Sequence, residues 1–168
     1  ASILALSSVV FGMLTQAGMP LLPAIALTLL AGAACGAFNG LMVTWLKLPS
    51  LIVTLATMAM FRGVGYILLG VNSINDFPDA FLDFLAHNVP GTLIPWTIVP
   101  FLVLAPLFLI ALQKMPVGRR IYAIGGSPDA ARYSGVQLGR TIFGLFVVSG
   151  VVCAMAGMVY AARLANAR

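Results

Sequence analysis

Long apolar runs constrain the fold of this chain more than any other feature of its sequence. A transmembrane helix needs about 20 mostly apolar residues. Five stretches approach that length, of which the first is short: residues 2–18, 21–46, 48–70, 96–113 and 141–162. Only 8% of the residues are charged, whereas about a quarter are charged in an ordinary soluble domain. The sequence therefore predicts an all-α protein, a polytopic transmembrane helical bundle with about five membrane segments.

The two ends of the sequence indicate a piece of a longer chain. No initiating Met and no charged signal-peptide segment precede the first apolar run, and the last run ends shortly before Arg168. We therefore expect residues 1–168 to be part of a single transmembrane domain.

The loops between the apolar runs differ in charge. Residues 71–95 hold three of the four acidic residues and no Lys or Arg, whereas residues 114–140 hold five of the nine basic residues. Short cytoplasmic loops collect Lys and Arg, so the first loop is predicted outside and the second, with Lys47, on the cytoplasmic side. Arg163 and Arg168 depart from this pattern, because a fifth helix leaving the cytoplasm would deliver them outside. Either a re-entrant element follows that helix or the charge rule fails there.

The formal net charge of +5 does not indicate nucleic-acid binding. The basic residues flank apolar runs, and no soluble basic domain is present in the sequence to hold phosphates. Such residues are typical of loops that face an anionic membrane surface. We expect a lipid membrane as a partner and no nucleic acid.

No side chains have the spacing of a catalytic or metal site. His87 has no partner His, Cys or Ser nearby, and Cys35 and Cys153 lie singly in different apolar runs. The sequence thus predicts no catalytic residues, no metal and no bound cofactor. Three acidic residues in the outer loop alternate with phenylalanines, which indicates either a short interfacial helix or a contact surface for an outer partner: Asp76, Asp79 and Asp83.

Small residues recur at four-residue spacing on two of the apolar runs. Membrane helices associate where small residues let their backbones approach closely. The pattern predicts helix packing within one subunit, and a contact between subunits or a moving seam are the alternatives. The residues are Gly32, Gly36 and Gly40 on the second run, and Gly150, Ala154 and Gly157 on the fifth.

Four polar side chains inside apolar runs are candidates for a pathway across the membrane. A charge at the centre of a membrane helix costs about 2.5–3.5 kcal/mol on insertion scales, so Arg62 should face protein, water or headgroups, either as an anchor or along the pathway. Because Gly63 and Gly65 follow it, we expect the helix to stop or break there. Asn39, Thr54 and Thr57 could line the pathway too, although each is also compatible with packing.

The cytoplasmic loop contains the signals of a short helix. Ser127 can accept an N–H bond as N-cap, Pro128 fits the first helical position, and Asp129 complements the positive helix end. Gly135 can take the positive φ of a residue that ends a helix. These signals predict a helix over residues 128–134, which must pack on its own membrane domain or on a partner because it is too short to be stable alone.

Upstream of this helix, residues 119–124 are predicted to form one or two helical turns that end at a Gly125-Gly126 hinge. Small residues beside Arg132, namely Ala130 and Ala131, would permit the close approach of a partner. The glycines do not form a nucleotide-binding loop, because their spacing is wrong and no βαβ unit surrounds them. Any nucleotide is therefore expected on another subunit.

Three motifs occur in order along the chain and together match the pattern of one protein family. The loop motif matches at Gly118, Arg119, Tyr122, Ala123, Ile124, Gly125, Ala130, Ala131 and Gly135, with Ser127 where the family usually has Asn. An earlier motif matches at Gly36, Asn39, Gly40, Pro49, Ile52, Thr54, Leu55, Arg62 and Gly63. The third lies in SGVVCAMAGMVYAAR, residues 149–163. In these motifs the chain resembles the permease subunits of bacterial sugar ABC importers of the ribose, xylose and galactoside type.

The resemblance implies an inner-membrane permease subunit that translocates a sugar or sugar-like solute delivered by a periplasmic binding protein. The implied partners are a second permease subunit, identical or different, and a cytoplasmic ABC ATPase that binds ATP and Mg²⁺. Residues 71–95 would then be a periplasmic loop and residues 114–140 the cytoplasmic coupling loop. The implied ATPase-coupling residues are Gly118, Arg119, Arg120, Tyr122, Ala123, Gly125, Ala130, Ala131, Arg132 and Gly135.

Three alternatives remain at this point. Half of an ion-coupled secondary transporter would need an intramembrane carboxylate or an internal repeat, and all four acidic residues lie outside the apolar runs. A related branched-chain amino-acid ABC permease would share the motifs. A purely structural membrane subunit would leave the capped cytoplasmic helix unexplained.

Overall fold

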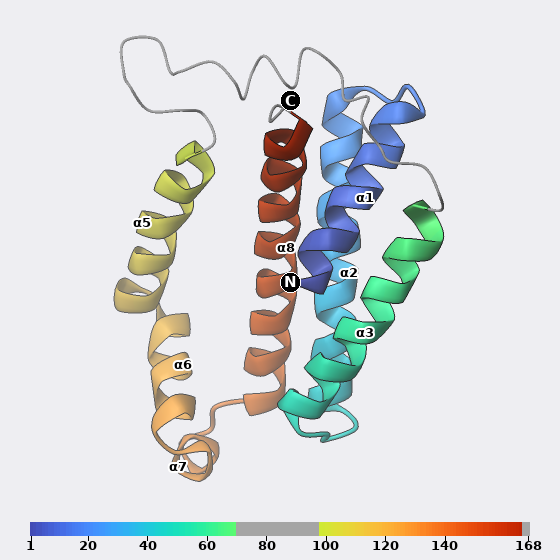
Figure 1. The fold of residues 1–168 in the computed structure, drawn as a ribbon. Coiled ribbons are helices and arrows are strands. Elements are labelled where there is room, and N and C mark those ends of the chain that lie inside the picture. Colours follow the sequence, from blue (N-terminus) through green and yellow to red (C-terminus); the bar gives the residue numbers. More distant parts are fainter. Residues whose placement is uncertain (70–97, 166–168) are drawn as a thin grey trace.

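The computed structural model describes residues 1–69 and 98–165, and these residues form helices and short connections without a strand. Figure 1 shows most of the helices side by side in a bundle, with α7 beyond one end. The helices are α1 Ser2–Gln16, α2 Leu21–Thr44, α3 Ser50–Leu69, α5 Val99–Lys114, α6 Pro116–Gly126, α7 Pro128–Tyr133 and α8 Leu138–Ala165. The predicted outer loop with Asp76, Asp79, Asp83 and His87 lies outside the described residues, as does Arg168.

The predicted helical membrane bundle is confirmed. Within the described residues three helices, α2, α3 and α8, are long and apolar enough to cross a membrane, and α5 with α6 makes a fourth candidate span if the bent pair is taken together. The first predicted segment, now α1, is apolar but has only 15 residues. The expectation of about five segments is therefore approximate for this part of the chain.

A sharp bend of 74° separates α5 from α6. Met115 between them is extended, with φ −91° and ψ 152°, and Pro116 is the first residue of α6. Proline disfavours the helical conformation in the residue before it, which ends α5 at that point. Gly118 is buried in the bend, where a Cβ would overlap the backbone of Leu112. The Met-Pro step and the small residue together turn the chain away from the axis of α5.

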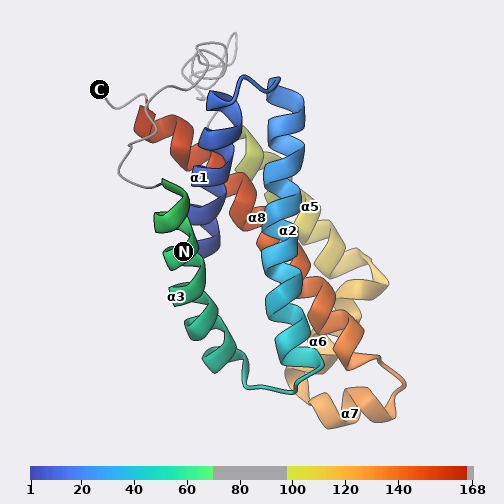
Figure 2. The ribbon, with the colours of Figure 1, turned by 90° about the vertical axis from the view of Figure 1, so that its right-hand side faces the viewer.

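The closest helix pair in the bundle is α2 with α8, which cross each other in Figure 2. A Cβ at Gly36 would overlap the carbonyl oxygen of Phe146 on α8, and a Cβ at Gly32 would lie 2.8 Å from the carbonyl oxygen of Gly150. In turn, a Cβ at Gly150 would overlap the backbone of α2. Both backbones therefore approach within a distance that only glycine permits at these positions.

The remaining small residues continue this contact in both directions. Gly40 faces the side chains of Phe143 and Phe146, with its Cβ position 3.1 Å from the ring of Phe143 and 3.1 Å from the Cβ of Phe146, and Ala154 is fully buried against Gly32. Gly157 lies against Ser7 of α1 instead. The small residues predicted from the sequence thus lie at contacts inside this chain, with two different helices as neighbours of α8.

A small apolar core fixes α1 in the angle between α2 and α8. Phe11 of α1, Ala24 of α2 and Met158 of α8 are buried together. On its other side α1 packs against α3, and the Phe38 and Phe61 rings, 6.4 Å apart and edge to face, join α2 to α3. The four helices form one packed unit.

Hydroxyl groups in these apolar helices bond to their own helix backbone. The Thr28 hydroxyl donates to the Ala24 carbonyl at 2.7 Å, and Thr15 donates to Gly12 at 2.8 Å. An unpaired hydroxyl in a low-dielectric interior is costly, and a carbonyl one helical turn back is always within reach. Buried Ser and Thr side chains therefore pack here as small, nearly apolar groups.

The predicted break after Arg62 is wrong, because α3 continues as one helix from Ser50 to Leu69 through Gly63 and Gly65. A glycine costs about 1 kcal/mol relative to alanine inside a helix, whereas each backbone group left unpaired in the hydrocarbon costs several kcal/mol. The helical hydrogen bonds therefore outweigh the preference of glycine for non-helical conformations.

We expect Gly36→Ala to lower the stability of the intact subunit, by about 1–3 kcal/mol, because the added methyl group overpacks the α2–α8 contact. The measurement is thermal unfolding of the detergent-purified protein. Gly63→Ala is the matched control, since it adds the same group to a helical glycine with no atom within 4 Å of its Cβ position. Equal behaviour of the two variants would contradict the close contact of α2 with α8.

Candidate functional site

The basic loop of residues 114–140 folds into α6 and α7 at one end of the bundle. Figure 1 shows α7 at the same end as the turn between α2 and α3, which contains Lys47. The turn between α1 and α2 lies at the opposite end. α7 and the turn with Lys47 therefore share one end of the molecule, as the charge pattern requires, and α6 leads along the bundle to that end.

The predicted short helix is confirmed as α7, and its two ends are capped by the expected residues. The Ser127 hydroxyl accepts a hydrogen bond from the Ala130 N–H at 3.3 Å, and Pro128 is the first helical residue. Gly135 has φ +79°. The N–H of Gly135 donates to the Arg132 carbonyl, and the N–H of Val136 to the Ala131 carbonyl, both at 3.1 Å. This is the paired bonding of a Schellman cap, which requires a left-handed residue that glycine supplies without strain.

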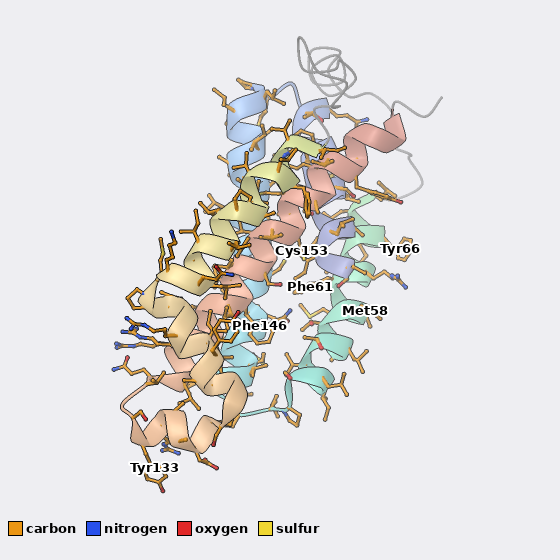
Figure 3. All side chains as sticks on the ribbon, turned by 90° about the vertical axis from the view of Figure 1, so that its left-hand side faces the viewer. Met58, Phe61, Tyr66, Tyr133, Phe146 and Cys153 are labelled. Carbon is orange, nitrogen blue, oxygen red and sulfur yellow. The ribbon has the colours of Figure 1, made fainter. Side chains whose placement is uncertain are left out.

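The faces of α7 have different environments. Ala131 is 2% exposed, so it packs against the chain's own helices, whereas Ala130 and Arg132 are exposed. Tyr133 is 93% exposed, and Figure 3 shows its side chain projecting from the end of the molecule. Of the two alanines predicted to admit a partner, only Ala130 is available to one. α7 is anchored from inside and presents Arg132 and Tyr133 outward.

The predicted Gly125-Gly126 hinge is wrong, since both glycines belong to α6. Neither has a positive φ, and glycine adopts ordinary helical angles when the backbone bonding continues. The break lies one residue later, where Ser127 is extended with φ −156° and ψ 109°. Pro128 follows it and disfavours the helical conformation in the residue before it.

The other predicted coupling residues lie on α6 and are mostly exposed. Arg119, Arg120, Tyr122, Ala123 and Gly125 are all exposed, whereas Gly118 is buried in the α5–α6 bend. Together with α7 they form a basic, partly aromatic surface at this end, which we call the cytoplasmic surface. Tyr133, the most exposed aromatic residue of this surface, was not among the residues predicted from the sequence. Its position at the end of a capped helix does indicate an exposed side chain.

The polar residues of α3 fall on two adjacent rows of the helix. Thr57 belongs to the buried row, and its hydroxyl donates to the Val53 carbonyl at 2.9 Å. Thr54 and Arg62 lie on the next row with Tyr66, and all three are exposed. Thr54 bonds its own backbone at 2.9 Å. In Figure 3 Tyr66 points away from the bundle while Phe61 lies on the inner side.

Arg62 is therefore an exposed cation in the interior of an apolar helix. It stands twelve residues after Ser50, about 18 Å along the axis at 1.5 Å per residue. Such a charge facing lipid alone would be costly, so the exposed row of α3 is expected to face protein or water in the membrane.

Asn39 differs from the threonines because its own helix does not satisfy it. The side chain is 5% exposed, and its Oδ1 has no hydrogen-bond partner within the described part of the chain. An unsatisfied buried acceptor costs about 1–3 kcal/mol. Of the two buried residues among the predicted pathway residues, Asn39 is the one that packing within the described residues does not explain.

The last helix carries the chain to the end of the bundle opposite α7. Because α8 is continuous to Ala165, the backbone of Arg163 lies on its final turns, at that far end. The re-entrant element that the sequence offered as one alternative would follow this helix, outside the described residues. Within them, the backbone of Arg163 departs from the distribution of the other basic residues.

Comparison with known proteins identifies the family. A family model described as "Branched-chain amino acid transport system / permease component" matches residues 1–168. This chain belongs to that permease family. No solved structure matches it significantly.

Two relatives place the permease more closely. It is 40% identical over 167 residues to the D-allose transport system permease protein AlsC of Escherichia coli strain K12, covering 99% of this chain and 51% of the relative. It is 34% identical over 173 residues to the autoinducer 2 import system permease protein LsrD of the same strain, covering 99% and 52%. The chain spans about half the length of these relatives. The family and the apolar helices make it a multi-pass inner-membrane protein, and the resemblance seen in the sequence motifs is confirmed.

We expect Ser127→Ala to loosen α7 of the permease by about 1 kcal/mol, because the N–H of Ala130 loses its acceptor. Hydrogen exchange of a peptide covering residues 127–136 should become faster. Ser127→Asp keeps an acceptor at the same position and should restore slow exchange. If all three proteins exchanged alike, the cap would not determine the stability of α7.

Proposed function

We propose that this chain is part of the membrane subunit of an ATP-driven importer that carries a sugar or sugar-like solute across the inner membrane. The observation that carries the proposal is α7, a helix capped at both ends and held at the cytoplasmic end of a membrane bundle. A buried Ala131 anchors it, and the exposed Arg132 and Tyr133 are available to a partner. A helix of six residues has no stability of its own in water, so its two caps indicate a selected, rigid contact element.

The expected partner is a cytoplasmic ABC ATPase that binds ATP and Mg²⁺, so that hydrolysis takes place on a separate subunit. Movement of α7 would reach α8 through the short connection that begins at Ser134, where Gly135 and Val136 are bonded back to α7. The glycine contact between α8 and α2 is too tight to slide without separating the helices. A displacement of α7 is therefore expected to move α8 and α2 together.

The substrate class follows from the names of the relatives. One is a permease for D-allose and the other for autoinducer 2, so we propose a sugar or a sugar-like small molecule delivered by a periplasmic binding protein. A second permease subunit would complete the pathway. The exposed row of α3 with Arg62 is proposed to face that pathway or the second subunit, because in either place the guanidinium group would not contact lipid.

The decisive experiment is transport by the intact permease in vesicles with its ATPase and binding protein, using D-allose as the first solute. Uptake should require ATP and continue in the presence of an ionophore. Uptake that persists without the ATPase but collapses with the ionophore would instead support an ion-coupled secondary transporter. Uptake of leucine in place of sugars would support a branched-chain amino-acid permease.

We expect Arg119→Glu to abolish most ATP-dependent uptake while leaving membrane insertion intact, because it reverses the charge of an exposed residue on the cytoplasmic surface. Lys47→Glu is the control, since it makes the same charge change at the same end of the bundle but outside α6 and α7. Unchanged uptake by Arg119→Glu, with normal insertion, would remove this residue from the coupling role.

We expect Asn39→Leu to raise the stability of the permease by about 1–3 kcal/mol, because it removes an unsatisfied buried acceptor at similar volume, and to lower solute uptake. Thermal unfolding and vesicle uptake are measured on the same preparation. The control is Thr57→Val, which removes a hydroxyl that its own helix already satisfies and should change uptake little. Loss of stability in Asn39→Leu would show instead that the amide is a packing group.

A further inference from the structure

A groove between α6 and α8 has a feature that coupling to an ATPase does not explain. Its volume is about 730 Å³, and its walls combine two arginines with apolar side chains. Arg120 comes from α6 and Arg140 from the start of α8. Val117, Gly144, Leu145 and Val148 form apolar parts of the wall, and the connection before α8 supplies further polar groups. The groove thus combines two cationic groups with apolar surface.

The position of the groove relative to the membrane follows from α8. The candidate span begins at Leu138, so Arg140 lies at its cytoplasmic end. Val148 lies ten residues after Leu138, about 15 Å deeper at 1.5 Å per residue. Arg140 therefore lies at the level of lipid headgroups, and the part of α8 from Gly144 to Val148 lies at the level of acyl chains.

Within the described part of the chain, no carboxylate neutralises the charge of the groove. Asp129, on the exposed face of α7, is the only acidic residue in the described part of the chain, and no ion pair to either arginine is present there. Arg140 donates to the side-chain oxygen of Gln137 at 2.9 Å, which holds its guanidinium at the groove. Two guanidinium groups without a carboxylate favour an anionic ligand, and planar Arg donors suit phosphate oxygens.

The second wall of the groove is itself suited to the membrane surface. α6 bends 74° away from α5 and carries Val117, Ile121 and Ile124 at helical spacing among its basic residues. An amphipathic helix of this kind lies at the boundary between headgroups and acyl chains. Basic pockets between membrane helices on the cytoplasmic side are a known way to hold anionic lipid headgroups.

We propose that this groove is a binding site for an anionic phospholipid, with its phosphate between Arg120 and Arg140 and an acyl chain along Gly144, Leu145 and Val148. A bound lipid would join α6 to α8, which otherwise touch at few positions. The site is independent of the transported solute and requires only that the protein spans the inner membrane.

The test is native mass spectrometry of the intact, detergent-purified permease with added phosphatidylglycerol or phosphatidylcholine. The wild type should bind phosphatidylglycerol more tightly. The double variant Arg120→Gln/Arg140→Gln should lose about fivefold in affinity for each arginine removed, from about 1 kcal/mol per basic residue. Lys114→Gln/Arg132→Gln removes the same charge outside the groove and should bind like the wild type.

A second variant tests the apolar wall without changing charge. Gly144 has no atom within 4 Å of its Cβ position, so Gly144→Phe can fold and place its ring in the groove. Phosphatidylglycerol binding should fall at least as much as in the arginine pair. Equal losses in both double variants would show that general surface charge attracts the lipid, and undiminished binding to Gly144→Phe would show that no acyl chain occupies the wall. Either result would overturn the proposed site.

Discussion

The contact between α2 and α8 is the constraint on which the rest of the structure depends. Lipid gives membrane helices no hydrophobic reason to associate, so the attraction must come from close van der Waals contact. At Gly32, Gly36 and Gly150 the two backbones come so near that a methyl group would overlap the facing helix. A contact of this kind has one register only. This contact fixes the crossing of α2 and α8, and α1 packs between these two helices. Because α3 packs against α1, the position of α3 follows as well.

The same contact gives the cytoplasmic surface a rigid support. Four residues separate the end of α7 from the start of α8, and the Schellman cap binds part of that connection to α7. A helix as short as α7 can transmit movement only when both its caps and its base are fixed. Ser127 and Gly135 supply the caps and Ala131 the base.

The sequence predicted the structure correctly where no other interaction opposed the local preference of a residue. The caps of α7 depend on a hydroxyl, a proline and a positive φ, all of which are properties of single residues. It failed at Gly63 and at Gly125-Gly126, where the same residue type that ends one helix remained inside another. In α3 the free-energy cost of leaving backbone groups unpaired in lipid exceeds the cost of placing glycine inside a helix. In α6 the break fell at the extended Ser127 before Pro128, so the proline and not the glycines determined it.

By itself, the sequence determined that this is a helical membrane protein with a basic end and a short capped helix there, because hydropathy, charge and capping act over short distances. Only the tertiary structure decided which small residues meet, since four-residue spacing is the same for a partner inside the chain or outside it. It separated Gly157, which faces α1, from Gly150, which faces α2. It also showed that Asn39 has a buried acceptor while Thr57 is satisfied, and that Arg120 and Arg140 line one groove. Those facts depend on how distant helices cross, which no local pattern in the chain specifies.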